Sequence, residues 1–314
     1  MIKGFYTTLR RPFFVLAPLD GVTDAVFRRI IAKYGKPDIL YTEFTSVDAL
    51  CSEGRAATLV NLKYSEKERP IVAQIFGSKP ELFYKTAKLL CKLGFDGIDI
   101  NMGCPEKTIV KSGSCAALIQ KPKLAQKIIR ATQEGASKIP VSVKTRIGFN
   151  EDETDTWIPA LLATKPAAIT IHGRTRKEMS KVPTHWDVIE KAVKIRDRLD
   201  SKTLIIGNGD VATLEDAKMK AKQYHVDGVM LGRAIFGNPW LFDERKKHVT
   251  QQERIKVFIE HAKLYERLFC KTKPFMLMKK HCKAYISGWP GAKILRKKLM
   301  ETNSVQEMQK VIDS

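Results

Sequence analysis

Apolar and polar positions follow two alternating rhythms along residues 13–242. Short runs of apolar, often β-branched residues occur eight times, at 14–17, 39–42, 71–75, 97–100, 141–143, 168–171, 204–206 and 228–231. The segments between them carry helical patterns that include residues 24–34, 81–93, 123–135, 184–199 and 213–224. Strands that are apolar along nearly their whole length are typical of a parallel sheet with both faces covered by helices. Eight such units predict an α/β fold, a (β/α)8 TIM barrel.

A doubly wound sheet is the competing architecture, and the end of the first strand does not fit it. Such a sheet typically carries a glycine-rich phosphate turn after its first strand. Here that strand ends in Ala17-Pro18-Leu19-Asp20-Gly21, which lacks the glycine pattern.

The alternation stops near residue 245, where a different pattern begins. Residues 251–269, 275–285, 291–300 and 305–312 form amphipathic segments that predict helices. We therefore predict two domains, a barrel over residues 1–244 and a small all-α C-terminal domain over residues 245–314.

Most predicted strands deliver a polar or charged residue as they end. The strand ends are Pro18, Glu43, Gln74, Asn101 with Cys104, Lys144 with Arg146, His172 with Arg174, Asn208 with Asp210, and Gly232 with Arg233. In a barrel the carboxyl ends of the strands meet at one face, which carries the chemistry. Pro105 cannot extend a strand, so the chain leaves the sheet at Cys104 and presents a thiol there.

Two glycine-containing turns follow the seventh and eighth strands. Asn208-Gly209-Asp210 and Gly232-Arg233 offer backbone N–H groups to an anion, at a frequent phosphate site of barrels. Gln74 suits a ring edge with donors and acceptors, and Lys144 and His172 supply positive charge or donors beside a ring that becomes anionic on reduction. FMN, with one terminal phosphate, fits this set better than FAD or a nicotinamide.

The charge balance indicates a polyanionic partner. Lys and Arg number 55 against 34 acidic residues, a formal net charge of +21, and such an excess favours nucleic acid. From residue 241 to 314, 17 basic residues stand against 8 acidic ones, so the helical segment holds nearly half of the net charge. Candidates for contacts to a nucleic-acid backbone are Lys279, Lys280, Lys283, Lys293, Arg296, Lys297 and Lys298.

Cysteine spacing and hydropathy exclude other classes. The six cysteines form no C-x-x-C pair and no zinc-like spacing with His, so we predict no metal site, and reduced thiols without a special role except at Cys104 and Cys115. No apolar run approaches the ~18–20 residues that span a bilayer, and the N-terminal residues lack a signal-peptide pattern. We expect a cytoplasmic protein without membrane contact, and a monomer, because its basic surface would repel a second copy.

Seven motifs resemble the tRNA-dihydrouridine synthases. They are Ala17-Pro18-Leu19, Val72-Ala73-Gln74-Ile75-Phe76-Gly77, Asn101-Met102-Gly103-Cys104-Pro105, Val143-Lys144-Thr145-Arg146-Ile147-Gly148, His172-Gly173-Arg174-Thr175-Arg176, Asn208-Gly209-Asp210 and Gly232-Arg233. They agree with the family in order and spacing over essentially the whole barrel. The segment from Lys280-His281 through Pro290-Gly291-Ala292 to Arg296 resembles the family's helical domain.

The resemblance implies an FMN-dependent oxidoreductase that reduces the C5=C6 bond of chosen uridines in tRNA, with NADPH or NADH as reductant. Cys104 would donate a proton to C5, as a thiol rather than a permanent thiolate. The implied FMN contacts are Pro18, Leu19, Asp20, Gln74, Lys144, His172, Asn208, Gly209, Asp210, Gly232 and Arg233. Asn101 would hold the uracil, with Arg146, Arg174 and Arg176 nearer to the RNA.

The chain departs from the family pattern after Arg176. The family usually has a Tyr and a Gly before its Asp-Trp, whereas residues 177–186 read Lys-Glu-Met-Ser-Lys-Val-Pro-Thr-His-Trp and lack the aromatic. Residue 19 is Leu where Met is common, and residue 20 is Asp where a small residue is common.

Two alternative functions stay open. A flavin-dependent reductase or dehydrogenase of a free pyrimidine, of the dihydroorotate or dihydropyrimidine type, would not need the basic helical segment. A non-catalytic RNA-binding protein on a barrel scaffold would not need Cys104 or the phosphate turns.

Overall fold

The computed structural model describes residues 4–314 of the chain. Residues 1–3, part of the N-terminal stretch predicted to lack a signal peptide, lie outside this range.

Eight parallel strands close into a barrel. They are β1 (Phe13–Leu16), β2 (Leu40–Tyr41), β4 (Ile71–Phe76), β5 (Gly97–Met102), β6 (Val141–Arg146), β7 (Ala168–His172), β8 (Leu204–Asn208) and β9 (Gly228–Leu231). They pair in the order β1-β9-β8-β7-β6-β5-β4-β2, and a bridge between Val15 and Ile39 joins the two ends. The predicted (β/α)8 barrel is confirmed, with one further short strand, β3 (Thr45–Ser46), paired with β4.

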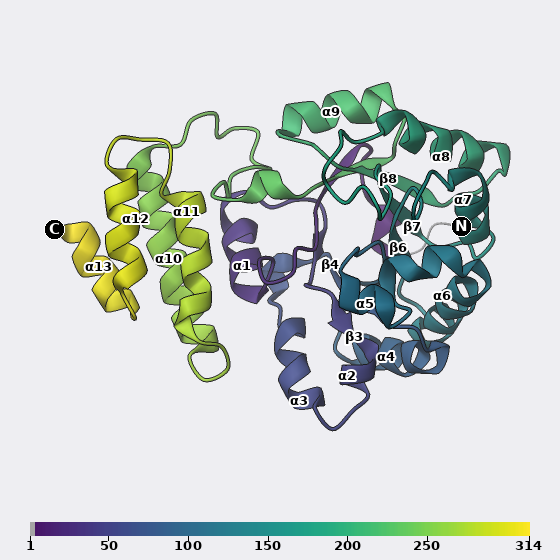
Figure 1. The fold of residues 1–314 in the computed structure, drawn as a ribbon, viewed down its shortest axis with the longest axis horizontal. Coiled ribbons are helices and arrows are strands. Elements are labelled where there is room, and N and C mark those ends of the chain that lie inside the picture. Colours follow the sequence, from purple (N-terminus) through teal and green to yellow (C-terminus); the bar gives the residue numbers. More distant parts are fainter. Residues whose placement is uncertain (1–3) are drawn as a thin grey trace.

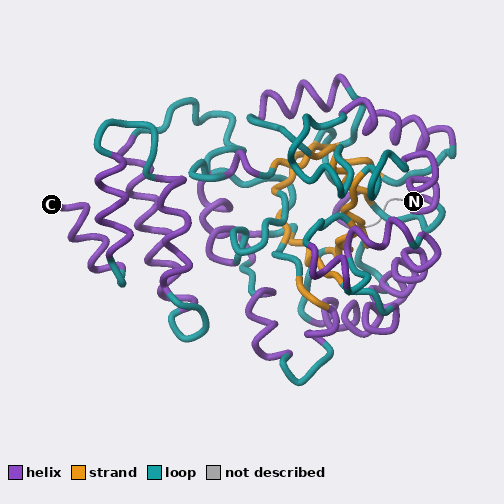
Figure 2. The backbone as a smooth tube through the Cα atoms, in the orientation of Figure 1, coloured by secondary structure: helices purple, strands orange, loops and turns teal. Residues whose placement is uncertain are grey.

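Helices surround the strands, as Figures 1 and 2 show. The barrel helices are α1 (Ala25–Tyr34), α2 (Val47–Leu50), α3 (Arg55–Thr58), α4 (Pro80–Lys92), α5 (Lys107–Lys111), α6 (Pro122–Ala136), α7 (Thr154–Leu162), α8 (Trp186–Arg198) and α9 (Leu214–Gln223). Helix α7 is not among the predicted helical patterns. Its interior Pro159 removes a helix donor, and the segment is apolar on more than one face.

Successive residues of each strand face opposite sides of the barrel wall. In β5, Ile98, Ile100 and Met102 pack into the hydrophobic layer between the strands and the outer helices. Asp99 and Asn101 therefore face the barrel interior, where a separate cluster that includes Val15, Tyr41, Val72 and Met230 fills the lower part. This alternation brings polar residues of neighbouring strands together at the upper end.

Four helical segments follow the barrel, and the first of them, α10, packs against α1 (Figure 1). They are α10 (Gln251–Phe269), a 3₁₀ segment Phe275–His281 that continues into α11 (Cys282–Tyr285), α12 (Ala292–Glu301) and α13 (Val305–Asp313). The capping box of Thr250 and Glu253 starts α10, because both side chains satisfy free backbone N–H groups.

The helical segments share a core with the barrel. Val26 and Ile30 of α1 belong to the same buried cluster as Phe258 of α10 and Tyr285 of α11. The boundary at residues 244/245 stays a prediction, because hydrophobic packing is continuous across it. Within residues 4–314, no helix is long and apolar enough to cross a membrane.

Candidate active site at the barrel mouth

A cavity of about 730 Å³ opens at the carboxyl ends of the strands. Nine of the eleven predicted cofactor residues line it: Pro18, Leu19, Lys144, His172, Asn208, Gly209, Asp210, Gly232 and Arg233. Two of the predicted substrate residues, Arg146 and Arg174, also line it. The structure thus brings together residues from β1, β6, β7, β8 and β9, as the rule for barrel active sites requires.

Two predicted cofactor residues are not in the cavity wall. The Gln74 side chain is fully buried inside the barrel, where its Nε2 donates to Asp99 and its Oε1 accepts from Asn101. Asp20 is exposed in the loop after β1. Asp20 follows a strand as predicted, but Gln74 lies within β4 rather than at its end, and the sequence did not show how deep either side chain lies.

Cys104 is held at the rim by its own loop. The Oδ1 of Asn101 accepts hydrogen bonds from the backbone N–H groups of Gly103 and Cys104, both at 3.0 Å. The Nε of Arg146 donates to the carbonyl of Gly103 at 2.8 Å. The loop is therefore pinned from two sides, and its next residue, Pro105, forms part of the cavity wall.

A second thiol, which the sequence set apart together with Cys104 but gave no role, lies against Cys104. Cys115 is buried at the start of a 3₁₀ helix, Cys115–Gln120, and the N–H of Ala116 bonds to the carbonyl of Cys104. The hydrogen bond from the Cys115 thiol lowers the pKa of Cys104 to about 7, against the opposing effect of burial. With a pKa near 7, Cys104 keeps its proton in part of the molecules at neutral pH and is not a permanent thiolate.

Lys144 is a cation without a carboxylate partner. Among residues 4–314, no carboxylate oxygen lies within hydrogen-bonding distance of its ammonium group, which faces the cavity. Burial and the nearby Arg146 lower the pKa of Lys144 to about 8. An unpaired cation in a partly buried wall is unfavourable by itself, so the cavity is built for an anionic ligand.

His172 is neutral and does not supply the predicted positive charge. Burial holds its pKa well below the ordinary range, and the surrounding cations, Lys144 first, add to this effect. Its Nε2 lies 3.2 Å from Nη1 of Arg174, which can only donate. The proton therefore sits on Nδ1, which leaves His172 as a neutral hydrogen-bond donor.

Asp210 joins two arginines beside the glycine turns. Arg174 bonds to one of its oxygens, and Arg233 bonds to the other at 2.8 Å. Burial acts to raise the pKa of Asp210, but these cations keep it below its ordinary value. Its carboxylate thus orients the arginines, and only its backbone is suited to contact a phosphate.

The glycine turns leave room for a ligand. Gly209 has a φ of +126°, and a side chain there would lie 2.6 Å from Oγ1 of Thr184. At Gly232 an added Cβ would meet only Ala17, at 3.7 Å, so it would occupy cavity space rather than clash with the protein. Together with the exposed Arg233, these turns form a cradle that suits a phosphate.

The three arginines predicted to bind the substrate also interact with other parts of the protein. Arg146 donates to the carbonyls of Thr175 and Met179, and Arg174 donates to that of Val182. Arg176 stacks on the Phe149 ring at 5.0 Å and lies outside the cavity wall.

Residues 179 and 180 are cavity residues that the sequence analysis did not assign. Met179 and Ser180 line the mouth, in the loop of residues 177–186 that departs from the pattern of the resembled family. Met179 has a φ of +55°, and its carbonyl accepts from Arg146. The departure of the loop from the family pattern was the available signal for these positions.

The predicted RNA contacts divide into two groups. Lys279 is buried and donates to the carbonyl of Met300 at 2.8 Å, and Arg296 donates to that of Ile286 at 2.6 Å. These two residues tie α12 to the preceding segments, so the structure does not support them as RNA contacts. The other five are exposed and have no carboxylate within 4 Å among residues 4–314: Lys280, Lys283, Lys293, Lys297 and Lys298.

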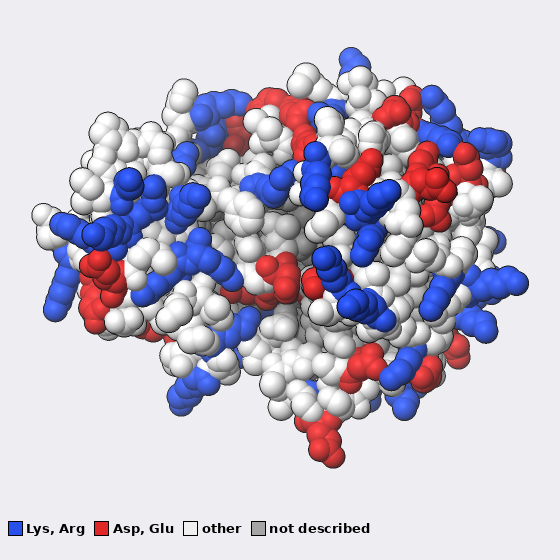
Figure 3. Space-filling model, in the orientation of Figure 1, with Lys and Arg blue, Asp and Glu red and all other residues white. Residues whose placement is uncertain are grey.

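The exposed cations extend to the barrel rim. Figure 3 shows Lys and Arg side chains over the C-terminal helices, next to a hollow in the centre of this face. A side chain added at Gly21, in the loop after β1, would lie 3.2 Å from Nζ of Lys280. Lys273 lies 3.8 Å from Glu43, which follows β2. The basic helices therefore border the cavity side of the barrel.

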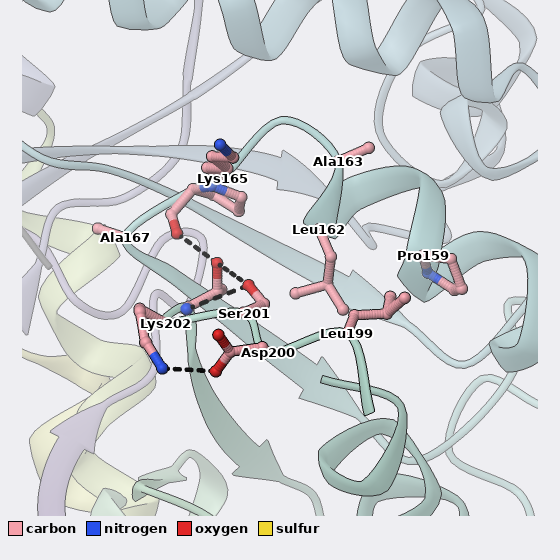
Figure 4. A pocket seen from close by; sticks show the side chains of 11 residues that line it. Pro159, Leu162, Ala163, Lys165, Ala167, Leu199, Asp200, Ser201 and Lys202 are labelled. Carbon is pink, nitrogen blue, oxygen red and sulfur yellow. Dashed lines mark hydrogen bonds and ion pairs between the residues drawn. The ribbon is translucent and has the colours of Figure 1, made fainter. Parts of the chain in front are cut away.

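A second cavity, of about 590 Å³, lies at the opposite end of the barrel (Figure 4). It is lined by residues that precede β7 and β8, among them Lys165, Asp200 and Lys202. Lys202 and Asp200 bond to each other at 2.6 Å, so their charges are satisfied. This end of a barrel contributes to stability rather than chemistry, and we do not assign a site to it.

The fold and the geometry of the mouth define a class, the (β/α)8-barrel proteins with a ligand site at the carboxyl ends of their strands. An old yellow enzyme homologue of Zymomonas mobilis aligns with a TM-score of 0.54 and 14% identity, covering 77% of this chain and 90% of that one. Histamine dehydrogenase of Rhizobium sp. 4-9 aligns with a TM-score of 0.57 and 12% identity, covering 80% and 48%. These likenesses show the fold.

Sequence comparison identifies the family. Residues 15–314 match the family model described as dihydrouridine synthase. A "Probable tRNA-dihydrouridine synthase" of Staphylococcus aureus (strain COL) is 40% identical over 316 residues, covering 100% of this chain and 96% of the relative. "Probable tRNA-dihydrouridine synthase 2" of Bacillus subtilis (strain 168) is 39% identical, covering 100% and 97%. This chain belongs to the dihydrouridine synthase family, so the resemblance of its motifs is confirmed.

Proposed function

We propose that this chain is a tRNA-dihydrouridine synthase, which reduces the C5=C6 bond of uridines in tRNA. The observation that carries the proposal is the family match over residues 15–314, with relatives named for this activity along their full length. The half-buried Cys104 beside a cation-lined cavity supports it, because this reaction needs both an acid and an anion-binding site.

The cavity fits FMN. Gly209, Gly232 and Arg233 form a cradle for its phosphate, and Lys144 provides the uncompensated positive charge that an electron-rich ring requires. FMN held by these residues, with NADPH or NADH as its reductant, would supply the hydride for C6 of the uracil. His172 contributes a neutral N–H donor at the same wall.

The protein itself supplies the proton. As C6 gains hydride, negative charge develops at C5, and the thiol of Cys104 can donate its proton there. Asn101 and Arg146 hold the Cys104 loop, so the acid is positioned before the substrate binds. Among residues 4–314, one N–H of the Asn101 amide has no partner, and this group can bind the uracil.

The helical segments supply the RNA-binding surface. A uridine in folded RNA must leave its stack to reach a barrel mouth, so the surrounding backbone has to be held nearby. The five exposed lysines and the adjacent hollow suit this task (Figure 3). With tRNA as the substrate we place the enzyme in the cytoplasm, as a monomer.

An anaerobic half-reaction tests the proposal. The bound flavin is reduced, tRNA that lacks dihydrouridine is added, and flavin reoxidation is followed by absorbance, with free uracil and orotate as controls. Reoxidation by tRNA alone is the expected result. Reoxidation by a free base alone would identify a small-pyrimidine enzyme instead, and protein that binds tRNA but no flavin would indicate a non-catalytic RNA-binding protein.

A further inference from the structure

A chain of buried hydrogen bonds runs through the barrel interior toward the cysteine loop. Oγ of Ser142 donates to Oδ1 of Asp99 at 2.6 Å, and Nε2 of Gln74 donates to Oδ2 of the same carboxylate at 2.8 Å. Nδ2 of Asn101 then donates to Oε1 of Gln74 at 3.1 Å. All four side chains are less than a tenth exposed, and they come from the three adjacent strands β4, β5 and β6.

The chain ends on the backbone of the catalytic loop. Oδ1 of Asn101 accepts from the N–H groups of Gly103 and Cys104, so its two acceptor positions are filled. The direction of the Asn101 amide therefore decides whether this loop is anchored. If the amide turned over, its NH₂ group would face two N–H donors, and the anchor would be lost.

Asp99 favours the anchored direction of this amide through Gln74. An ionised carboxylate only accepts, so Gln74 must turn its NH₂ toward Asp99 and its oxygen toward Asn101. Asn101 must then offer its NH₂ to Gln74 and its oxygen to the loop. The carboxylate of Asp99 at one end of the chain and the backbone N–H groups of Gly103 and Cys104 at the other favour the same direction of both amides.

Asp99 is mostly ionised at neutral pH, although its pKa is raised. Burial raises its pKa to about 6, while hydrogen bonds from Ser142 and Gln74 and the charge of Lys144 on β6 act the other way. The remaining titratable groups that face it are Tyr6 and Tyr41, whose pKa values burial raises, so both stay neutral.

We propose that Asp99 is a positioning residue for the catalytic cysteine, acting through the amides of Gln74 and Asn101. The inference rests on the proposed function in that Cys104 is taken as the acid. Asp99 is fully buried below the mouth and is not part of the cavity wall, so it acts on the reaction only through other side chains.

The substitution Asp99→Asn tests this with the full-length protein. It keeps the shape of the side chain but lets Gln74 adopt either direction. The readout is the rate at which iodoacetamide alkylates Cys104 between pH 5 and pH 9, measured by mass spectrometry of the cysteine-containing peptides. We expect the alkylation rate of Cys104 to change by about tenfold, because the loop loses a buried hydrogen-bonded anchor. The exposed Cys51 and Cys270 of the same sample are internal controls and should not change.

A double-mutant cycle separates positioning from general damage. If Asp99 acts through Asn101, Asp99→Asn should have no further effect on Cys104 alkylation in an Asn101→Ala background. Thr170→Val is the matched control, because Thr170 is buried on β7 and its hydroxyl lacks a partner among the described residues. Unchanged alkylation in Asp99→Asn, or the same change in both backgrounds, would overturn the proposal.

A second variant keeps the test open if Asp99→Asn does not fold. Ser142→Ala removes one donor to the carboxylate, so the pKa of Asp99 rises and the accompanying change in Cys104 alkylation should move to higher pH. An unmoved profile would contradict the proposal. Alkylation needs no tRNA, so the result is independent of the flavin-reoxidation assay, and either proposal can fail without the other.

Discussion

The cations at the barrel mouth and those on the C-terminal helices are arranged in opposite ways. At the mouth, Arg146 donates to three backbone carbonyls, and Arg174 and Arg233 share the carboxylate of Asp210. On the helices, lysines such as Lys293 and Lys297 are exposed and have no carboxylate within 4 Å among residues 4–314. The cations at the mouth are held in position by their hydrogen-bond partners, whereas the lysines on the helices are exposed to solvent.

The difference matches two kinds of recognition. Chemistry on one bond requires groups that are held in place before the substrate arrives, because reorganisation would raise the barrier. A polyanion can be held by many independent contacts, each weak and sensitive to salt. Single substitutions at the mouth should therefore have large effects on turnover or on FMN affinity. Single substitutions on the helices should have small, additive effects on tRNA affinity.

The largest expected effect is at Cys104. Cys104→Ala removes the proposed acid, and turnover with tRNA should fall by about 10²–10⁴-fold, the usual contribution of general acid catalysis. Flavin content should stay at the wild-type level, since Cys104 is not in the cavity wall. Single-turnover flavin reoxidation measures the change, with Cys270→Ala as the control. Wild-type turnover in Cys104→Ala would remove the acid role.

Arg233 tests the phosphate cradle. Arg233→Ala removes a charge-assisted contact to the proposed phosphate, and the dissociation constant of FMN should rise by about tenfold to a hundredfold. Titration of the flavin-free protein by fluorescence quenching gives the constant. Lys202→Ala, at the opposite end of the barrel, is the control and should bind FMN normally. Equal affinity in both variants would place the phosphate elsewhere.

The next largest effect is expected in how the rate of proton transfer depends on pH. The pKa of Cys104 is lowered to about 7, so the fraction that still carries a proton falls as the pH rises through 7. With pre-reduced enzyme, the rate should then decline by about tenfold for each pH unit above 7.

Cys115→Ala shows whether the neighbouring thiol causes this dependence. The variant loses the hydrogen bond that lowers the pKa of Cys104, so the decline should begin at higher pH. A profile identical to that of the wild type would show that Cys115 does not set the acidity of Cys104.

The smallest effects are expected on the helices. Removing one exposed lysine, as in Lys297→Gln, should weaken tRNA binding only a few-fold and reduce the slope of log affinity against log salt by about 0.7–0.9. When Lys283, Lys293, Lys297 and Lys298 are all replaced by Gln, the changes in affinity and in salt slope should add up. Lys123 and Lys127 on α6, also exposed, are matched controls. A salt slope that the combined variant leaves unchanged would move the RNA surface away from these helices.

The sequence predicted the barrel and most of its mouth because both depend on local patterns. Apolar runs mark the strands, and the alternation of side chains places Lys144, His172 and Asn208 on the inner face. The depth of a side chain depends on partners from other strands. Gln74 is therefore predicted to meet a ligand, whereas the structure gives its amide to Asp99 and Asn101.

The remaining differences have the same origin. Lys279 and Lys280 are neighbours in sequence, yet Lys279 is buried on the carbonyl of Met300 and Lys280 is exposed. A basic run in a sequence shows how much charge a segment has, but not which side chains the fold uses internally. Likewise, only the tertiary structure brings Cys115 to Cys104.

The shared core between α1 and the C-terminal helices limits how this protein can be rebuilt. Val26 and Ile30 lie in the helical cluster, so a graft of residues 245–314 onto a different barrel would lack its docking partner. A chimaera that exchanges RNA specificity should carry α1 along with the C-terminal helices. Exchange of specificity between relatives therefore involves two distant stretches of the gene that must change together.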